Sequence, residues 1–159
     1  QRAGALAQVA AFGVNFGVCH SEFILTAQGP VLVEINYRSI GDGREFLLDR
    51  LLPQGWFDRI VALYLGDSLI DAQPAQAEAT VHYLVVDRSG RLDQASASFN
   101  VEREGHWCDY RALHNTGDTV TISHSNKDYV GVLRLIAPDE VSLEAQLNST
   151  LNDLKWVMA

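Results

Sequence analysis

The sequence is poor in positive charge. Its 159 residues include 12 lysines and arginines against 20 aspartates and glutamates, which gives a formal net charge of −8. Nucleic acids and anionic membranes bind proteins through basic patches. The charge therefore argues against a nucleic acid and against a membrane as the partner of this protein.

Cysteine and long hydrophobic runs are scarce as well. Two cysteines, Cys19 and Cys108, make no disulfide framework and fit a reducing compartment. No uninterrupted apolar run approaches the roughly 20 residues of a membrane-spanning helix. No basic segment followed by an apolar one opens the sequence as a secretion signal would. These absences lead us to expect a cytoplasmic protein.

The apolar content is high enough for a core. Hydrophobic residues make up 47% of the chain, and its length suits one domain or one domain with part of another. The chain starts at Gln1 without a methionine and enters what reads as a helix in progress. We therefore expect a fragment of a longer protein.

Helical and strand periodicities predict an α+β protein. The first part, residues 1–73, should hold an antiparallel hairpin with flanking helices, and the second, residues 74–159, a β-rich lobe closed by a C-terminal helix; together they should form one compact unit. The expected helices are 2–13, 44–52, 56–66 and 142–159, with Ser142 as the N-cap of the last. The expected strands are 18–26, 31–38, 80–87, 91–102, 117–123 and 128–137.

Polar residues interrupt the most apolar part of the chain, at the predicted hairpin. Residues two apart in a strand face the same way, so Glu34, Asn36 and Arg38 should share one face of the second strand. His20 and Glu22 should share a face of the first strand. A loop of three or five residues centred near Gln28 would bring Glu22 opposite Glu34.

Two carboxylates facing each other across a ladder repel, and a hard divalent cation is the natural compensation. Asn36 would supply a further oxygen ligand, and Arg38 could hold a phosphate through two hydrogen bonds. His20 could orient a ligand or contact a substrate, although a histidine in a strand is more often structural. The alternative is a solvated polar face with no function.

The stretch resembles the metal-binding end of the ATP-grasp superfamily. The resemblance rests on "GVCHSEF", on "EINYR", whose Glu34 follows Glu22 by 12 residues, and on the loop "RSIGDG". It implies the C-terminal part of an ATP-grasp fold, in which Glu22, Glu34 and Asn36 bind one or two Mg²⁺ ions that bridge the phosphates of ATP. It also implies that Arg38 faces the γ-phosphate or the acyl phosphate.

The implied activity is an ATP- and Mg²⁺-dependent ligase that joins a carboxylate to an amine through an acyl phosphate. The run "EINYRSIGDGREFLLDRLL" most resembles ATP-grasp enzymes of siderophore biosynthesis, and ligases of this type are often homodimers. One departure matters: the only lysines, Lys127 and Lys155, lie far downstream of the hairpin. The resemblance therefore implies that the nucleotide-binding lysines belong to a missing N-terminal part and that this fragment is inactive alone.

Two alternatives remain at this stage. The chain could be a non-catalytic binding or assembly module that keeps the fold. His106, Cys108, Asp109 and His114 could also form a zinc site, but their spacing matches no closed zinc pattern, and an aromatic-rich strand is favoured.

Overall fold

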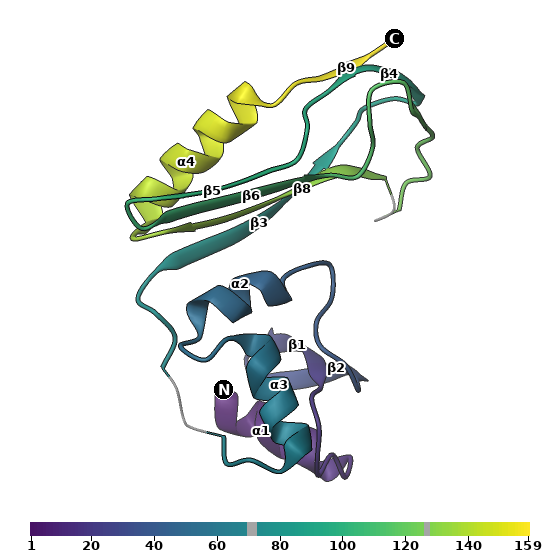
Figure 1. Ribbon diagram of the computed structural model, residues 1–159. Helices are drawn as coiled ribbons and strands as arrows, with labels where there is room; N and C mark the ends of the chain where they lie inside the picture. The colour runs from purple at the N-terminus through teal and green to yellow at the C-terminus, as the bar shows by residue number, and fades with distance from the viewer. Residues whose placement is uncertain (70–72, 126–127) are drawn as a thin grey trace. The chain divides into compact units, whose positions relative to one another are not determined.

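The computed structural model describes residues 1–69, 73–125 and 128–159, and the chain divides into two compact units, Gln1–Ala75 and Gln76–Ala159 (Figure 1). The first unit contains α1 (Arg2–Ala11), β1 (His20–Thr26), β2 (Gly29–Asn36), α2 (Glu45–Leu51) and α3 (Trp56–Leu65). The second contains β3 (Glu78–Val85), β4 (Gly90–Ala95), β5 (Phe99–Arg103), β6 (His106–Ala112), β7 (Thr119–Val120), β8 (Tyr129–Ala137), α4 (Glu140–Asp153) and β9 (Trp156–Met158). The expected α+β composition is confirmed.

Helix α1 is fastened to the β1–β2 hairpin by one side-chain amide. Gln8 Nε2 donates to the carbonyl oxygen of Pro30 at 2.6 Å, and the backbone N–H of Leu32 donates to Gln8 Oε1 at 3.0 Å. A glutamine amide has both a donor and an acceptor, so it can satisfy backbone groups that another strand would otherwise pair. Gln8 thus covers part of the outer edge of β2.

Helices α2 and α3 are joined by a tight connection. The Asp49 carboxylate accepts a hydrogen bond from the backbone N–H of Phe57 at 3.0 Å, which satisfies one of the free donors at the start of α3. Gly55 has a φ of 70°, and a Cβ there would lie 2.8 Å from Asp49 Oδ1. Glycine is therefore required at this position by both its conformation and its close neighbour.

The first unit buries little of its apolar surface. Among its described residues, Leu47 alone has a buried hydrophobic side chain, at 8% exposure. Large hydrophobic side chains are exposed on every element of the unit, as the following set illustrates: Leu6, Phe12, Ile24, Val31, Val33, Leu48, Val61 and Leu65. A polypeptide of this size without a core gains little hydrophobic free energy on folding.

The second unit has its core under α4. Its sheet has the order β3-β8-β6-β5, with antiparallel neighbours throughout, and α4 lies against one face (Figure 1). The buried sheet residues of this core are Cys108, Tyr110, Leu133 and Leu135, and α4 contributes Leu143, Leu147 and Leu151. Burial raises the pKa of Tyr110 from 10 to about 12, because the ionised phenolate would lose its solvation in this core.

A smaller sheet of order β7-β4-β9 corrects two sequence predictions. The strand predicted at 91–102 is two strands, β4 and β5, and the helix predicted to reach residue 159 ends at Asp153. One pair of residues lies at both the interruption between β4 and β5 and the end of α4. Lys155 N donates to Ser96 Oγ at 2.8 Å, and Ser96 N donates to Lys155 O at 3.0 Å. This pairing directs Trp156–Met158 into β9 against β4.

Two further predictions need correction. The strand predicted at 117–123 is only Thr119–Val120. The N-cap of α4 is Asp139 and not Ser142, because Asp139 Oδ1 accepts from the backbone N–H of Ser142 at 2.8 Å. An aspartate at this position satisfies a free backbone N–H of the helix, and its negative charge interacts favourably with the positive end of the helix dipole.

Within the described ranges no helix is long and apolar enough to cross a membrane.

We expect Gly131→Ala to destabilise the second unit by about 1–3 kcal/mol, the usual cost of overpacking a core. A Cβ at this position would lie 2.8 Å from Tyr110 Cε2, and the Tyr110 side chain is only 1% exposed and cannot move aside. Urea unfolding followed by circular dichroism and tryptophan fluorescence measures the change. Gly4→Ala is the control, since its Cβ would meet Pro30 at an ordinary 3.4 Å. An unchanged midpoint for Gly131→Ala would contradict this account of the packing.

Candidate functional site

The β1–β2 hairpin pairs the polar residues that the sequence singled out. Glu22 lies opposite Glu34, and His20 lies opposite Asn36, in an antiparallel register. Residues directly opposite in such a ladder project to the same face of the sheet. The expectation that Glu22 and Glu34 are opposed is therefore confirmed, and His20 and Asn36 join them.

The register results from a two-residue turn and a β-bulge, and not from the odd-numbered turn that the sequence predicted. The turn holds two residues, Ala27 and Gln28, and not the three or five that we expected, because Thr26 pairs with Gly29. An even turn alone would set Glu22 against Val33. The register shifts instead between Glu22 and Phe23, where Val33 has no partner and forms a β-bulge. This extra residue moves Glu34 to the position opposite Glu22.

The polar face is open to solvent. The side chain of Glu22 is 53% exposed and that of His20 is 21% exposed, with His20 Nε2 at 4.0 Å from Glu22 Oε1. His20 Nδ1 is buried and has no hydrogen-bond partner. The imidazole is thus held beside the Glu22 carboxylate, where it contributes charge only when protonated.

The metal ligands remain a prediction. In the part of the chain that the structure describes, no group of three or more histidine, cysteine, aspartate or glutamate side chains is placed to hold a metal ion. That statement also covers the zinc alternative at His106, Cys108, Asp109 and His114. The proposed set on the hairpin comprises two carboxylates and the Asn36 amide, which are the oxygen donors that Mg²⁺ prefers.

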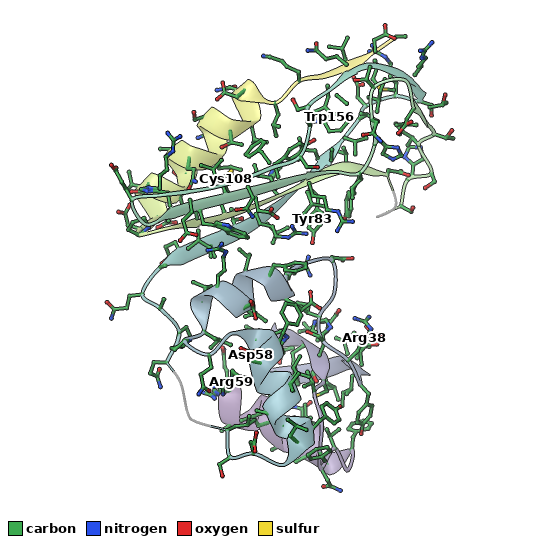
Figure 2. The ribbon with its side chains drawn as sticks, in the orientation of Figure 1. Arg38, Asp58, Arg59, Tyr83, Cys108 and Trp156 are labelled. Carbon is green, nitrogen blue, oxygen red and sulfur yellow. The ribbon has the colours of Figure 1, made fainter. Side chains whose placement is uncertain are left out.

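Arg38 lies just beyond the end of β2 (Figure 2). Its backbone N–H donates to the carbonyl oxygen of Asn36 at 2.8 Å. Its Nη1 donates to the carbonyl oxygens of Ser39 and Ile40, each at 3.0 Å. A guanidinium has five N–H donors, so these two hydrogen bonds from Nη1 use only part of its donor capacity, and phosphate binding by Arg38 stays a prediction.

The loop after Arg38 is held from two further sides. The backbone N–H of Gly41 donates to Glu45 Oε1 at 2.5 Å, and Trp56 Nε1 donates to Ser39 Oγ at 3.0 Å. Gly41, Asp42 and Gly43 all have positive φ, at 87°, 55° and 74°. The sequence shows the two glycines of this loop, but nothing in its pattern indicated the contacts of Glu45 and Trp56. The glycine pair around an aspartate was the available signal for a left-handed loop.

The pKa of Glu45 is lowered from its ordinary value of 4.5. Partial burial opposes ionisation, but the backbone N–H groups of Glu45 and Gly41 and the Ser39 hydroxyl together outweigh it, and the charge of Arg38 adds to them. The ionised carboxylate is therefore the form that holds the loop.

A shallow pocket of about 300 Å³ lies along β2. Its lining residues are mostly apolar and come from the segment after α1, from β2 and from the residue that follows β2: Phe12, Val14, Leu32, Val33, Glu34, Ile35 and Tyr37. Glu34 thus stands between an apolar pocket and the polar face. A ligand with an apolar part and an anionic part would fit this arrangement when a cation is present.

Comparisons with known proteins agree with this fold. No protein-family model matches the chain. An uncharacterized protein, y4rH, of Sinorhizobium fredii is 22% identical over 146 residues, which cover 92% of this chain and 30% of that protein. Phosphoribosylglycinamide synthetase from Anaerococcus prevotii has a TM-score of 0.77 at 12% identity, over 95% of this chain and 39% of that one. L-amino acid ligase from Bacillus licheniformis has a TM-score of 0.70 at 16% identity, over 95% and 38% of the two chains.

The chain has the fold of the C-terminal part of ATP-grasp ligases. At these identities the likeness establishes the fold alone. The chain spans less than two-fifths of the length of each of the three proteins. The ATP-grasp fold expected from the hairpin sequence is confirmed.

We expect Glu45→Gln to lower the free energy of unfolding at neutral pH and to have no effect near pH 3. A carboxyl whose pKa is lowered by folding stabilises the protein above its unfolded pKa and loses that contribution as the pH falls through the folded pKa. Urea midpoints of wild type and variant, measured from pH 7 to pH 3, should converge as the pH falls through the lowered pKa of Glu45. Exposed Glu144→Gln, on α4, is the control. A constant difference at all pH values would show that Glu45 acts by packing alone.

Proposed function

We propose that this chain is part of an ATP- and Mg²⁺-dependent ligase that joins a carboxylate to an amine through an acyl phosphate. The observation that carries the proposal is the opposition of Glu22 and Glu34 on the open face of the hairpin, beside Asn36. Opposed carboxylates repel, so a fold that keeps them together is suited to a divalent cation. The ATP-grasp fold supports the same assignment.

The proposed chemistry follows from charge. A carboxylate that attacks the γ-phosphate of ATP approaches another anion, so both need neutralisation and in-line positioning. Glu22, Glu34 and Asn36 would hold Mg²⁺, which supplies positive charge to the phosphates. The Nε and Nη2 groups of Arg38 would stabilise the transferring group, while Nη1 keeps the following loop in place. His20 would orient Glu22 or contact the substrate.

We expect Glu34→Gln to reduce ADP formation by the complete enzyme by about 10²-fold or more, because it removes one charged ligand of the cation. Coupled measurement of ADP at increasing Mg²⁺ concentration tests this, and a partial recovery at high Mg²⁺ would identify a cation-binding role. Glu144→Gln, which changes the same charge on exposed α4, should leave the rate unchanged. Wild-type activity of Glu34→Gln would exclude the proposed site.

We also propose that the first unit binds the remainder of the same enzyme. Its described residues include many exposed hydrophobic side chains and one buried one, Leu47, so its surface is suited to burial against further polypeptide. The short coverage of the matched proteins is consistent with a missing region of that kind. The nucleotide-binding lysines, which the hairpin lacks, would come from this region.

We expect residues 1–159 alone to form no ADP and to bind ATP more weakly than about 1 mM, since the hairpin provides a cation and phosphate site without a nucleotide cradle. Isothermal titration with ATP and Mg²⁺ measures the affinity. Addition of the remaining part of the enzyme, produced separately, should restore binding. A micromolar dissociation constant for the isolated chain would refute this division of roles.

We also propose a pathway, a cellular location and an assembly for the enzyme. Siderophore biosynthesis is proposed as the pathway on the strength of residues 34–52, with a carboxylic acid and an amine as substrates. A cytoplasmic location is proposed because Cys19 and Cys108 are both free thiols. A homodimer is proposed as the assembly.

A further inference from the structure

Strand β5 is the last strand of the four-stranded sheet of the second unit (Figure 1). All five of its residues are exposed, whereas most residues of β3, at the opposite end of the sheet, are half-buried. An exposed edge strand is a template for pairing with another strand, and proteins usually protect it. Strand β5 lies at that kind of edge.

The geometry of the β5–β6 hairpin determines which groups point outward. Its two-residue turn, Glu104–Gly105, has positive φ at both positions, 51° and 79°, as in a type I′ turn. Arg103 pairs with His106 next to that turn, so Phe99, Val101 and Arg103 direct their backbone groups toward β6. The alternate positions direct theirs to the outer edge of the sheet.

A groove of about 670 Å³ runs between β5 and α4 on the core side of the sheet. Phe99 and Val101, which are 36% and 42% exposed, form its apolar floor. Arg103 and Asp153 are opposite charges on its rim. The groove is therefore both apolar and charged at defined places.

These two charges lie at opposite ends of the groove. Ser96, just before β5, exchanges hydrogen bonds with Lys155, just after α4, so the C-terminal end of α4 lies beside Phe99. Asp153 is accordingly at the Phe99 end of the groove. Arg103 is at the other end, next to the turn.

We propose that a second copy of this chain pairs its β5 antiparallel to this β5, about a two-fold axis at Val101. In that register Val101 meets its own copy at a non-hydrogen-bonded position, where Cα atoms approach to about 4.5 Å. Phe99 meets Arg103 of the second copy. The two four-stranded sheets become one continuous sheet with an α4 from each copy on the same face.

The charges along the groove favour a second copy over other occupants. The two-fold axis brings Arg103 of one copy to the Phe99 end of the other, beside Asp153, and repeats the contact on the opposite side. Each Arg103 also lies over a Phe99 ring, which adds a cation–π contact. Because the strand is complementary to itself, it can pair with an identical chain and does not require a different protein as its partner. The inference concerns assembly and does not depend on the ligase activity.

Analytical ultracentrifugation of residues 1–159 and of the complete protein, from about 1 to 100 µM, tests the proposal, because one short strand pair implies a micromolar dimer. Arg103→Asp and Asp153→Arg should each raise the dissociation constant about tenfold or more by placing like charges together. The double variant, Arg103→Asp with Asp153→Arg, should recover dimers because the pair is restored in reverse. Arg2→Asp, an equal charge change on exposed α1, is the control.

Three results would overturn the proposal. A monomer over the whole concentration range excludes the dimer. An association that both single variants leave unchanged belongs to another surface, such as the apolar surface of the first unit. A complete protein that is monomeric, while the 159-residue chain dimerises, indicates that a strand from the rest of the protein occupies the edge. Circular dichroism of each variant verifies folding, and recovery in the double variant excludes misfolding as the cause.

Discussion

The arrangement of the candidate site depends on one unpaired residue in an otherwise regular ladder. Val33 has no partner on β1, and the register on its two sides differs by one residue. Because side chains alternate with a period of two, a one-residue shift moves every following side chain to the other face. The bulge therefore decides that Glu34 and Asn36 share a face with Glu22 and His20. Without it, Val33 would be opposite Glu22.

Contacts within the loop that follows β2 fix the orientation of Arg38. The guanidinium donates to two carbonyl oxygens of the loop, while Glu45 accepts from Gly41 at its centre. Positive φ values at three successive residues are costly for Asp42 and are retained only where surrounding contacts hold them. The side chain that would meet a phosphate is thereby oriented by its own backbone neighbours. Its orientation does not require a bound ligand.

The two units differ in how much of their stability is internal. The second unit has a core in which Leu133 and Leu135 are 0% exposed beneath α4, and Arg134 donates to the Asp109 carboxylate at 2.5 Å. The first unit exposes most of its large hydrophobic side chains. Burial of apolar surface is the main favourable term in folding, so the second unit is the better candidate for an independent fold.

Local signals in the sequence were sufficient to predict several helices and strands and the residue types of the site. Period-two and helical patterns located β1, β2, β8 and α3, and the resemblance of the hairpin sequence to the ATP-grasp superfamily implied the fold. Tertiary structure alone decided the bulge at Val33, the end of α4 at Asp153 and the clamps on the loop by Glu45 and Trp56. The bulge and the end of α4 have the same physical cause. Pairing with residues distant in the sequence, such as Lys155 with Ser96, outweighs local propensity, and no local pattern encodes the partner.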